Sequence, residues 1–266
     1  AIGPGTRGST WAAGGMLAAG IEAEPGEEAL TALCLESQRQ WPGFRDELEQ
    51  LTGISVGYRD EGTMVVATNR DEAAALRPHY DYQVGLGISL EWLTPAEARR
   101  KEPHLGRNIA AAVYSAGDHQ VENRDLLRAL VAACKAAGVS LNAETPVDEL
   151  LVRGDRAAGI RTGDSEVQAD AVVIAAGAWS GSIKGLPPKA TPPVRPLKGQ
   201  MLAVQMDPAA PILSHVVWAP TTYLIPRLDG RLLIGATVEE RGFDDQITAG
   251  GLLALLDTAW RALPTI

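Results

Sequence analysis

One uninterrupted apolar run, Ala171-Val-Val-Ile-Ala-Ala-Gly177, constrains the fold more than any other feature of the sequence. A continuous apolar strand that ends at glycine is typical of a parallel sheet covered on both faces. A helix capped by Asn123 and ended by Gly138 is expected before it. Short strands are expected between them, over 139–142, 147–152, 158–162 and around Val167. This order of helix, meander and buried strand fits a doubly wound nucleotide-binding domain with an inserted meander.

The segments on either side of this region predict further helices and strands. Apolar residues at helical spacing predict a helix over 27–51, interrupted at Pro42-Gly43. Thr94-Pro95-Ala96-Glu97 has the pattern of a helix start. Strands are expected over 64–68, 109–115, 200–205, 216–218, 222–226 and 232–236, with a hairpin turn at 228–231 and a closing helix over 247–263. The chain is therefore expected to be mixed α/β (α+β), with a doubly wound domain interleaved with an antiparallel sheet.

Composition excludes several classes of protein. The 266 residues are 45% apolar with a net charge of -9, so the chain is globular, and we expect no nucleic-acid or anionic-membrane partner. No apolar run reaches the roughly 18 residues of a membrane span. Cys34 and Cys134 lie in apolar helical patterns and are interpreted as buried thiols in a reducing cytosol. The first residue is not Met, and both ends are expected to be cut from a longer protein.

The pattern Gly3-x-Gly5-x-x-Gly8 matches a dinucleotide-binding fingerprint literally. Only Ala1-Ile2 precede it and Pro4 lies inside it, so it lacks the strand that delivers a pyrophosphate to a helix N-terminus. We interpret it as a flexible loop. A nicotinamide-dependent dehydrogenase would need a helix directly after Gly8, and residues 11–15 do not have a helical pattern.

Two further small-residue stretches each leave two interpretations open. Residues 9–19 either pack as a turn against a neighbouring helix or pass close to a flat ligand. Residues 175–180 either form a tight strand-to-helix turn or admit a ligand at the end of the buried strand, with Trp179 as a wall. The histidines, His79, His104, His119 and His215, show no metal-ligand spacing, and no HExxH, CxxC or GxSxG motif occurs. If the protein is an enzyme, a cofactor is expected to carry the chemistry.

Several stretches, in the same order along the chain, resemble the FAD-dependent family of D-amino-acid and glycine oxidases, and most of all the bacterial glycine oxidases of thiamine biosynthesis. The matching stretches are 9–19, 117–121, 145–147, 172–179, 194–200, 223–227, 234–237 and 239–243. The resemblance implies that FAD lies along Ser9, Thr10, Gly14, Gly15, Met16, Val147, Ala175, Ala176, Gly177 and Trp179. It implies that Tyr223, Trp218, Met16 and Val238 line the substrate pocket. No metal site is implied.

The resemblance also implies a division of labour and a reaction. Residues 1–52 and 117–185 would belong to an incomplete FAD-binding domain, and 53–116 and 186–266 to the substrate-binding domain. The reaction would be oxidation of a small amine or amino acid (glycine, sarcosine or a D-amino acid) by hydride transfer to FAD, with dioxygen reduced to hydrogen peroxide. The full-length protein would be a cytoplasmic homo-oligomer.

The sequence departs from the family at both ends. The family's GxGxxG strand and ribose-binding acidic residue would precede Ala1, and its substrate-carboxylate arginine would follow Ile266. This chain alone is therefore expected to be inactive. The alternative is a non-catalytic fragment or small-molecule-binding module that lacks FAD.

Overall fold

The computed structural model describes residues 8–266, which divide into two compact units. The larger unit comprises 9–138, 199–237 and 247–266. The smaller unit comprises Gly8, 139–198 and 238–246. The chain therefore passes between the units several times.

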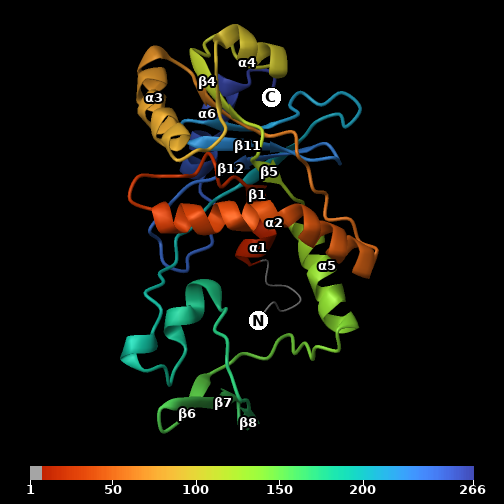
Figure 1. Cartoon of the computed structure of the whole chain (residues 1–266), viewed down its shortest axis with the longest axis vertical. Coiled ribbons are helices and arrows are strands. Elements are labelled where there is room, and N and C mark those ends of the chain that lie inside the picture. Colours follow the sequence, from red (N-terminus) through yellow and green to blue (C-terminus); the bar gives the residue numbers. More distant parts are fainter. Residues whose placement is uncertain (1–7) are drawn as a thin grey trace. The chain divides into compact units, whose positions relative to one another are not determined.

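A seven-stranded sheet forms the centre of the larger unit (Figure 1). Its strands are β2 (Thr63–Ala67), β3 (Glu91–Leu93), β4 (Ala111–Ser115), β9 (Leu202–Gln205), β10 (Val216–Ala219), β11 (Thr222–Pro226) and β12 (Arg231–Gly235). Their order is β3-β4-β2-β10-β11-β12-β9. Only the β2–β10 pair is parallel, and every other pair is antiparallel. The antiparallel sheet expected from the sequence is thus present, and the β2–β10 pair joins its two sequence halves.

Helices and a short two-stranded sheet complete the larger unit. The helices are α1 (Ser9–Ala12), α2 (Glu28–Thr52), α3 (Arg70–Gly85), α4 (Pro95–Lys101), α5 (Asn123–Ala136) and α6 (Ala249–Ala262). The strands of the short sheet are β1 (Met16–Leu17) and β5 (His119–Gln120), which pair antiparallel. Thr94 and Glu97 form the expected capping box, which starts α4.

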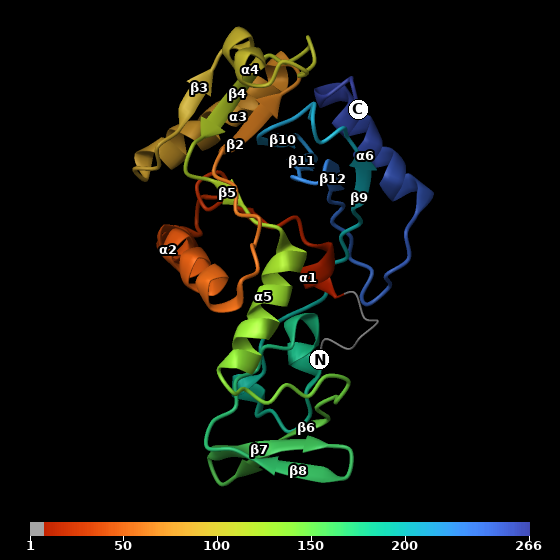
Figure 2. The same ribbon diagram turned by 90° about the vertical axis from the view of Figure 1, so that its right-hand side faces the viewer.

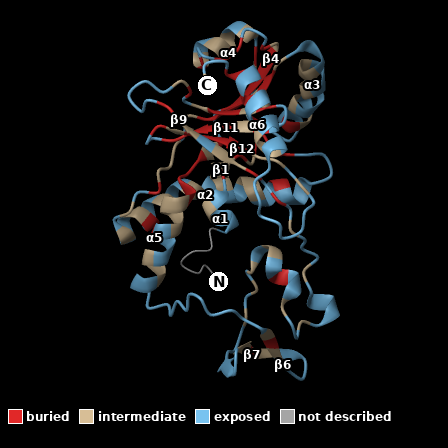
Figure 3. Cartoon of the chain, turned by 180° about the vertical axis from the view of Figure 1, so that it is seen from behind, coloured by how far each residue is buried: buried red, intermediate tan, exposed pale blue. Residues whose placement is uncertain are grey.

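The main core lies on one face of the seven-stranded sheet. Helix α6 packs on β10, β11 and β12, and α4 packs on β3 and β4 (Figure 2). Met64, Leu224, Leu232 and Ile234 are completely buried on this face, and the buried residues concentrate along these strands (Figure 3). Because side chains alternate along a strand, Trp218, Tyr223 and Ile225 point to the opposite face. Packing on one face therefore stabilises the sheet, and the opposite face is available for a binding site.

The smaller unit contains the expected meander. It is formed by β6 (Glu149–Arg153), β7 (Arg156–Thr162) and β8 (Ser165–Gln168). Two 3₁₀ turns follow, η1 (Gly177–Ser182) and η2 (Pro188–Ala190). An isolated bridge between Lys198 and Glu239 joins segments 139–198 and 238–246 of this unit.

Two of the predicted strands are wrong. Residues 171–176 form no strand, and the side chain of Val173 is 88% exposed. A parallel strand needs hydrogen-bonded neighbours, and no strand in the described part of the chain pairs with this run. Residues 139–142 are exposed and irregular for the same reason.

Two predicted helix boundaries also need correction. Helix α2 continues through Pro42. Pro42 is exposed, so water can satisfy the carbonyl that loses its donor. Glu122, and not Asn123, is the N-cap of α5, and Asn123 is the first helical residue. The amide of Asn123 instead donates to the carbonyl oxygens of Thr10 (2.6 Å) and Trp11 (3.2 Å).

Candidate functional site

The face of the sheet opposite the main core brings together three of the residues predicted to bind substrate. Trp218 and Tyr223 are cross-strand partners whose ring centroids lie 5.6 Å apart at an interplanar angle of 45°. Met16 packs beside them on the small cluster of Val216, Ile225 and Leu233. Two aromatic rings and a flexible thioether form an apolar surface suited to a small organic molecule.

One buried polar atom on this face has no partner. Trp218 Nε1 is buried and makes no hydrogen bond to any residue that the structure describes. A buried N–H without an acceptor is unfavourable, and such groups are uncommon in folded proteins. The indole N–H of Trp218 is therefore available to a bound acceptor, such as a carboxylate oxygen.

The glycine-rich segment 9–16 contacts this face through Gly14 and Met16. A β-carbon on Gly14 would be 2.5 Å from Ile225 Cδ1, and one on Gly15 would be 2.1 Å from the carbonyl oxygen of Val121. Gly15 also has a φ of 66°, which favours glycine. The first reason for glycine at both positions is thus close packing on the protein itself. A valine at position 14 would meet Ile225 before any ligand.

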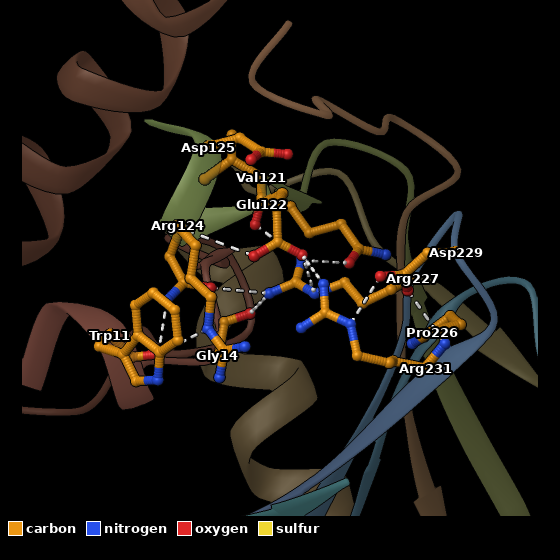
Figure 4. Close-up of polar contacts among 12 residues, drawn as sticks. Trp11, Gly14, Val121, Glu122, Arg124, Asp125, Pro226, Arg227, Asp229 and Arg231 are labelled. Atoms are coloured by element: carbon orange, nitrogen blue, oxygen red, sulfur yellow. Dashed lines mark hydrogen bonds and ion pairs between the residues drawn. The ribbon is translucent and has the colours of Figure 1, made fainter. Parts of the chain in front are cut away.

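A hydrogen-bonded cluster around Arg227 holds the other side of the segment (Figure 4). Arg227 is 5% exposed and donates to the carbonyl oxygens of Gly14 (2.8 Å) and Val121 (2.7 Å). Burial lowers the pKa of Arg227 to about 10, and the nearby Glu122 carboxylate opposes this shift, so the guanidinium is charged at neutral pH. In the sequence, Arg227 stands out only as the last residue of the 223–227 stretch. An arginine that directly follows an apolar strand was the available signal.

Carboxylates lie near the same region. Asp118 is 1% exposed and accepts hydrogen bonds from the backbone N–H groups of Gly20 (2.8 Å) and Ile21 (2.8 Å) and from Gln38 Nε2 (2.8 Å). Glu22 is an exposed residue, but protein atoms around its carboxyl partly desolvate it. This desolvation raises the pKa of the carboxyl, and the charge of Asp118 raises that pKa further. Burial raises the pKa of Tyr223, and the charge of Glu22 adds to this effect.

Replacing Glu22 with glutamine is expected to stabilise the protein at neutral pH. The raised pKa means that folding favours the neutral carboxyl, so the ionised form destabilises the native state above that pKa. Below about pH 4 the carboxyl is protonated in both states and the difference vanishes. Thermal unfolding of Glu22→Gln and of the unmodified protein across pH tests this. A higher melting temperature for the unmodified protein at pH 7 would contradict it.

The other predicted residues lie elsewhere. Ser9 and Thr10 are exposed in α1. Six belong to the smaller unit, namely Val147, Ala175, Ala176, Gly177, Trp179 and Val238. Trp179 is 58% exposed and stacks on Phe243, with ring centroids 5.1 Å apart at 21°. The larger unit thus brings together Met16, Trp218 and Tyr223, and the smaller unit holds an exposed aromatic stack.

The structure also bears on the glycine fingerprint, on metal sites, on membrane spans and on the two cysteines. Gly3 and Gly5 of the literal fingerprint lie outside the described residues. Gly8 is followed directly by the four-residue helix α1, so the expectation that 11–15 are not helical is wrong for Trp11 and Ala12, while 13–15 are not helical. Within residues 8–266, no group of histidine, cysteine or acidic side chains is arranged to hold a metal ion. No described helix is both long and apolar enough to cross a membrane. Cys34 and Cys134 are free thiols, though each is only partly buried.

Known proteins with similar sequences and structures include glycine oxidases. A glycine oxidase from Geobacillus kaustophilus is 37% identical over 262 residues, which are 97% of this chain and 68% of that protein. A bifunctional ThiO/ThiG protein from Trichormus variabilis is 34% identical over 96% of this chain and 38% of its own length. The crystal structure of the Geobacillus glycine oxidase superposes with a TM-score of 0.86 at 35% identity, covering 97% of this chain and 68% of that one.

The fold and these similarities define a flavin-dependent oxidoreductase of mixed α/β architecture. The family described as "DAO: FAD dependent oxidoreductase" matches residues 3–266. The chain belongs to this family, whose cofactor is FAD.

The described residues are compatible with a bound flavin along segment 9–16. The carbonyl oxygens of Thr10, Trp11 and Gly14 are occupied by side-chain donors, so one side of the segment is committed to the protein. The orphaned Trp218 N–H and the ring of Tyr223 lie on the adjoining sheet face. Polar donors beside an apolar surface suit a planar heteroaromatic group and a small polar substrate.

Proposed function

We propose that the protein carrying this chain oxidises a small amino acid or amine, such as glycine, sarcosine or a D-amino acid, to the corresponding imine. The observation that carries the proposal is the sheet face where Met16, Trp218 and Tyr223 meet beside an unpartnered indole N–H. Its support is the 37% identity to a glycine oxidase. Dioxygen would be the second substrate, and the full-length protein would be a cytoplasmic homo-oligomer.

The chemistry that FAD would supply when bound is a two-electron oxidation, in which the substrate loses a hydride from carbon and a proton from nitrogen, and dioxygen finally takes up both to give hydrogen peroxide. The chain's own residues would orient the substrate. Trp218 Nε1 would donate to a carboxylate oxygen, and the ring of Tyr223 would limit the size of the pocket. The apolar surround of Met16 and Ile225 would exclude water from the reacting carbon.

The positions of the cofactor-binding residues are part of the proposal. Ser9, Thr10, Gly14, Gly15 and Met16 would follow the flavin, and Val147, Ala175, Ala176, Gly177 and Trp179 would line the remainder of FAD. Val238 would add to the substrate pocket. Residues 1–52 and 117–185 would serve the FAD-binding domain, and 53–116 and 186–266 the substrate-binding domain.

Substrate-dependent hydrogen peroxide production in the presence of FAD tests the proposal. We expect peroxide with at least one of glycine, sarcosine and D-alanine. Reduction of an artificial electron acceptor without peroxide would assign the protein to the dehydrogenases. A colourless preparation that takes up no FAD and turns over no amine would favour the alternative, a non-catalytic small-molecule-binding module.

Replacing Tyr223 with phenylalanine removes the hydroxyl, which in this proposal would donate a hydrogen bond to the substrate. The KM for the amino acid is expected to rise roughly tenfold, the effect of losing one hydrogen bond in a buried site. FAD affinity should stay unchanged because the ring is kept. Tyr114→Phe is the matched control, since the hydroxyl of Tyr114 donates to the carbonyl oxygen of Glu61 (2.8 Å) on the opposite face. Steady-state kinetics that show the same KM for all three proteins would remove Tyr223 from the pocket.

A further inference from the structure

Arg227 connects the end of β11 to the segment that the proposed function places on the flavin. Nη1 donates to Gln120 Oε1 (3.1 Å) and to the carbonyl oxygen of Val121 (2.7 Å). Nη2 donates to the carbonyl oxygen of Gly14 (2.8 Å) and to Asn123 Oδ1 (3.1 Å). Nε lies 3.4 Å from Glu122 Oε2, which makes an ion pair. Most of the hydrogen-bonding capacity of this guanidinium is thus used by two segments of chain, the one that contains Gly14 and residues 120–123.

Segment 9–16 has little regular structure that could fix its own shape. It contains one turn of helix, α1, and the first residue of the two-residue strand β1. The main-chain N–H of Val121 donates to the carbonyl oxygen of Gly15 (2.8 Å), and side chains hold the carbonyl oxygens of Thr10, Trp11 and Gly14. Asn123 Nδ2 donates to Thr10 and Trp11, Arg124 Nε donates to Trp11 (3.3 Å), and Arg227 donates to Gly14. The guanidinium of Arg124 also lies 3.9 Å from the centroid of the Trp11 ring (Figure 4).

The charges around Arg227 are balanced within the cluster. Glu122 accepts from Arg231 Nη2 (2.7 Å) and pairs with Arg227, and Asp229 accepts from Arg231 Nε (2.7 Å). A buried, paired guanidinium with fixed planar donors holds its acceptors in a defined geometry. A lysine in its place would keep the charge but would reach fewer of these acceptors.

We propose that Arg227 is a positioning residue for FAD. It holds the carbonyl oxygen of Gly14 and the amide of Asn123, and through them it sets the conformation of residues 9–16. Arg227 acts through this segment and contacts neither flavin nor substrate in the proposed arrangement. The inference rests on the proposed function, because it needs the segment to face the flavin.

The test compares Arg227→Met and Arg227→Lys with the control Arg59→Met. Arg59 is an arginine with 11% of its side chain exposed that also donates to backbone carbonyl oxygens, those of Pro226 (2.9 Å) and Ser214 (2.8 Å), but its side chain makes no bond to residues 9–16. Amide hydrogen exchange of peptides covering 9–16, measured without FAD, reports the conformation of the segment. Titration with FAD, followed by the flavin absorption spectrum, reports its consequence.

Arg227→Met is expected to speed exchange in 9–16 and to raise the FAD dissociation constant, each roughly tenfold or more, as expected for the loss of a charge-assisted hydrogen bond. Arg227→Lys should restore part of both effects, and it replaces Arg227→Met if that variant does not fold. Arg59→Met should lower the melting temperature without either effect. The inference would be overturned if residues 9–16 exchanged equally fast in the Arg227 and Arg59 variants. It would also be overturned if the Arg227 variants had the same FAD affinity and flavin spectrum as the unmodified protein. If the unmodified protein binds no FAD, the proposed function fails and the role of Arg227 toward FAD fails with it, even where the exchange data show that Arg227 orders the segment.

Discussion

Replacing Gly15 with alanine is expected to lower the free energy of unfolding by about 3 kcal/mol, because the left-handed backbone and the crowded β-carbon both add strain. The new β-carbon would lie 2.1 Å from the carbonyl oxygen of Val121 and 3.1 Å from Arg227 Nη2. The Val121 oxygen is main chain and accepts from Arg227, so it cannot move without breaking that bond. Urea unfolding measures the change, and FAD content should fall with it.

Gly53→Ala is the matched control for Gly15→Ala. Gly53 has a φ of 68° in the same unit, and a β-carbon there would meet nothing within 4 Å. Only the backbone strain remains, which costs about 1 kcal/mol. The difference between the two variants isolates the steric contact. Equal losses would show that Gly15 does not press against Val121 and that segment 9–16 lies farther from β5 than described.

Replacing Asp118 with alanine is expected to destabilise the protein by about 3 kcal/mol, because each buried donor left without an acceptor costs about 1–3 kcal/mol. The carboxylate accepts from the backbone N–H groups of Gly20 and Ile21, both at 2.8 Å, and no solvent can replace it at 1% exposure. The variant should also remove the charge that raises the pKa of Glu22. Urea denaturation gives the first effect directly.

Asp207→Ala provides the comparison for Asp118→Ala. Asp207 also accepts from a backbone N–H, that of Ala209 (2.9 Å), but it does so in an exposed turn where water can take its place. Its loss should cost less than about 1 kcal/mol. If Asp118→Ala is no more destabilising than Asp207→Ala, the bonds from Gly20 and Ile21 do not hold segment 17–22 in solution.

Local patterns in the sequence were enough to predict the antiparallel sheet. Strands β10, β11 and β12 follow short apolar runs separated by turn residues, and the hairpin at 228–231 carries the Asp-Gly pair such turns favour. The capping box at Thr94 predicted the start of α4 for the same reason. Each of these elements is specified by residues close together in the chain.

Elements that depend on distant partners were not predictable in this way. The apolar run at 171–177 reads as a buried strand, but strand formation depends on neighbours that a local pattern does not reveal. Asparagine is a preferred N-cap residue, yet the side chain of Asn123 donates to the carbonyl oxygen of Thr10, more than a hundred positions away in sequence. The Arg227 cluster likewise joins segments far apart in the chain, and no spacing rule describes it.

The residues proposed to bind substrate were found through family resemblance and not through spacing. Trp218 and Tyr223 are five positions apart, and only the tight β10–β11 hairpin makes them cross-strand neighbours on one face. The orphaned indole N–H of Trp218 became visible only once its surroundings were known. Physical chemistry explains why such a pair suits a small organic ligand, but the sequence alone does not place it beside Met16.

Anaerobic mixing of the FAD-loaded protein with glycine, sarcosine or D-alanine tests the central claim most directly. We predict that at least one of these amines bleaches the oxidised-flavin absorbance, that admitted dioxygen restores it with release of hydrogen peroxide, and that Tyr223→Phe needs a higher amine concentration for the same bleaching. Flavin that is bound and stays oxidised with every small amine would contradict the account.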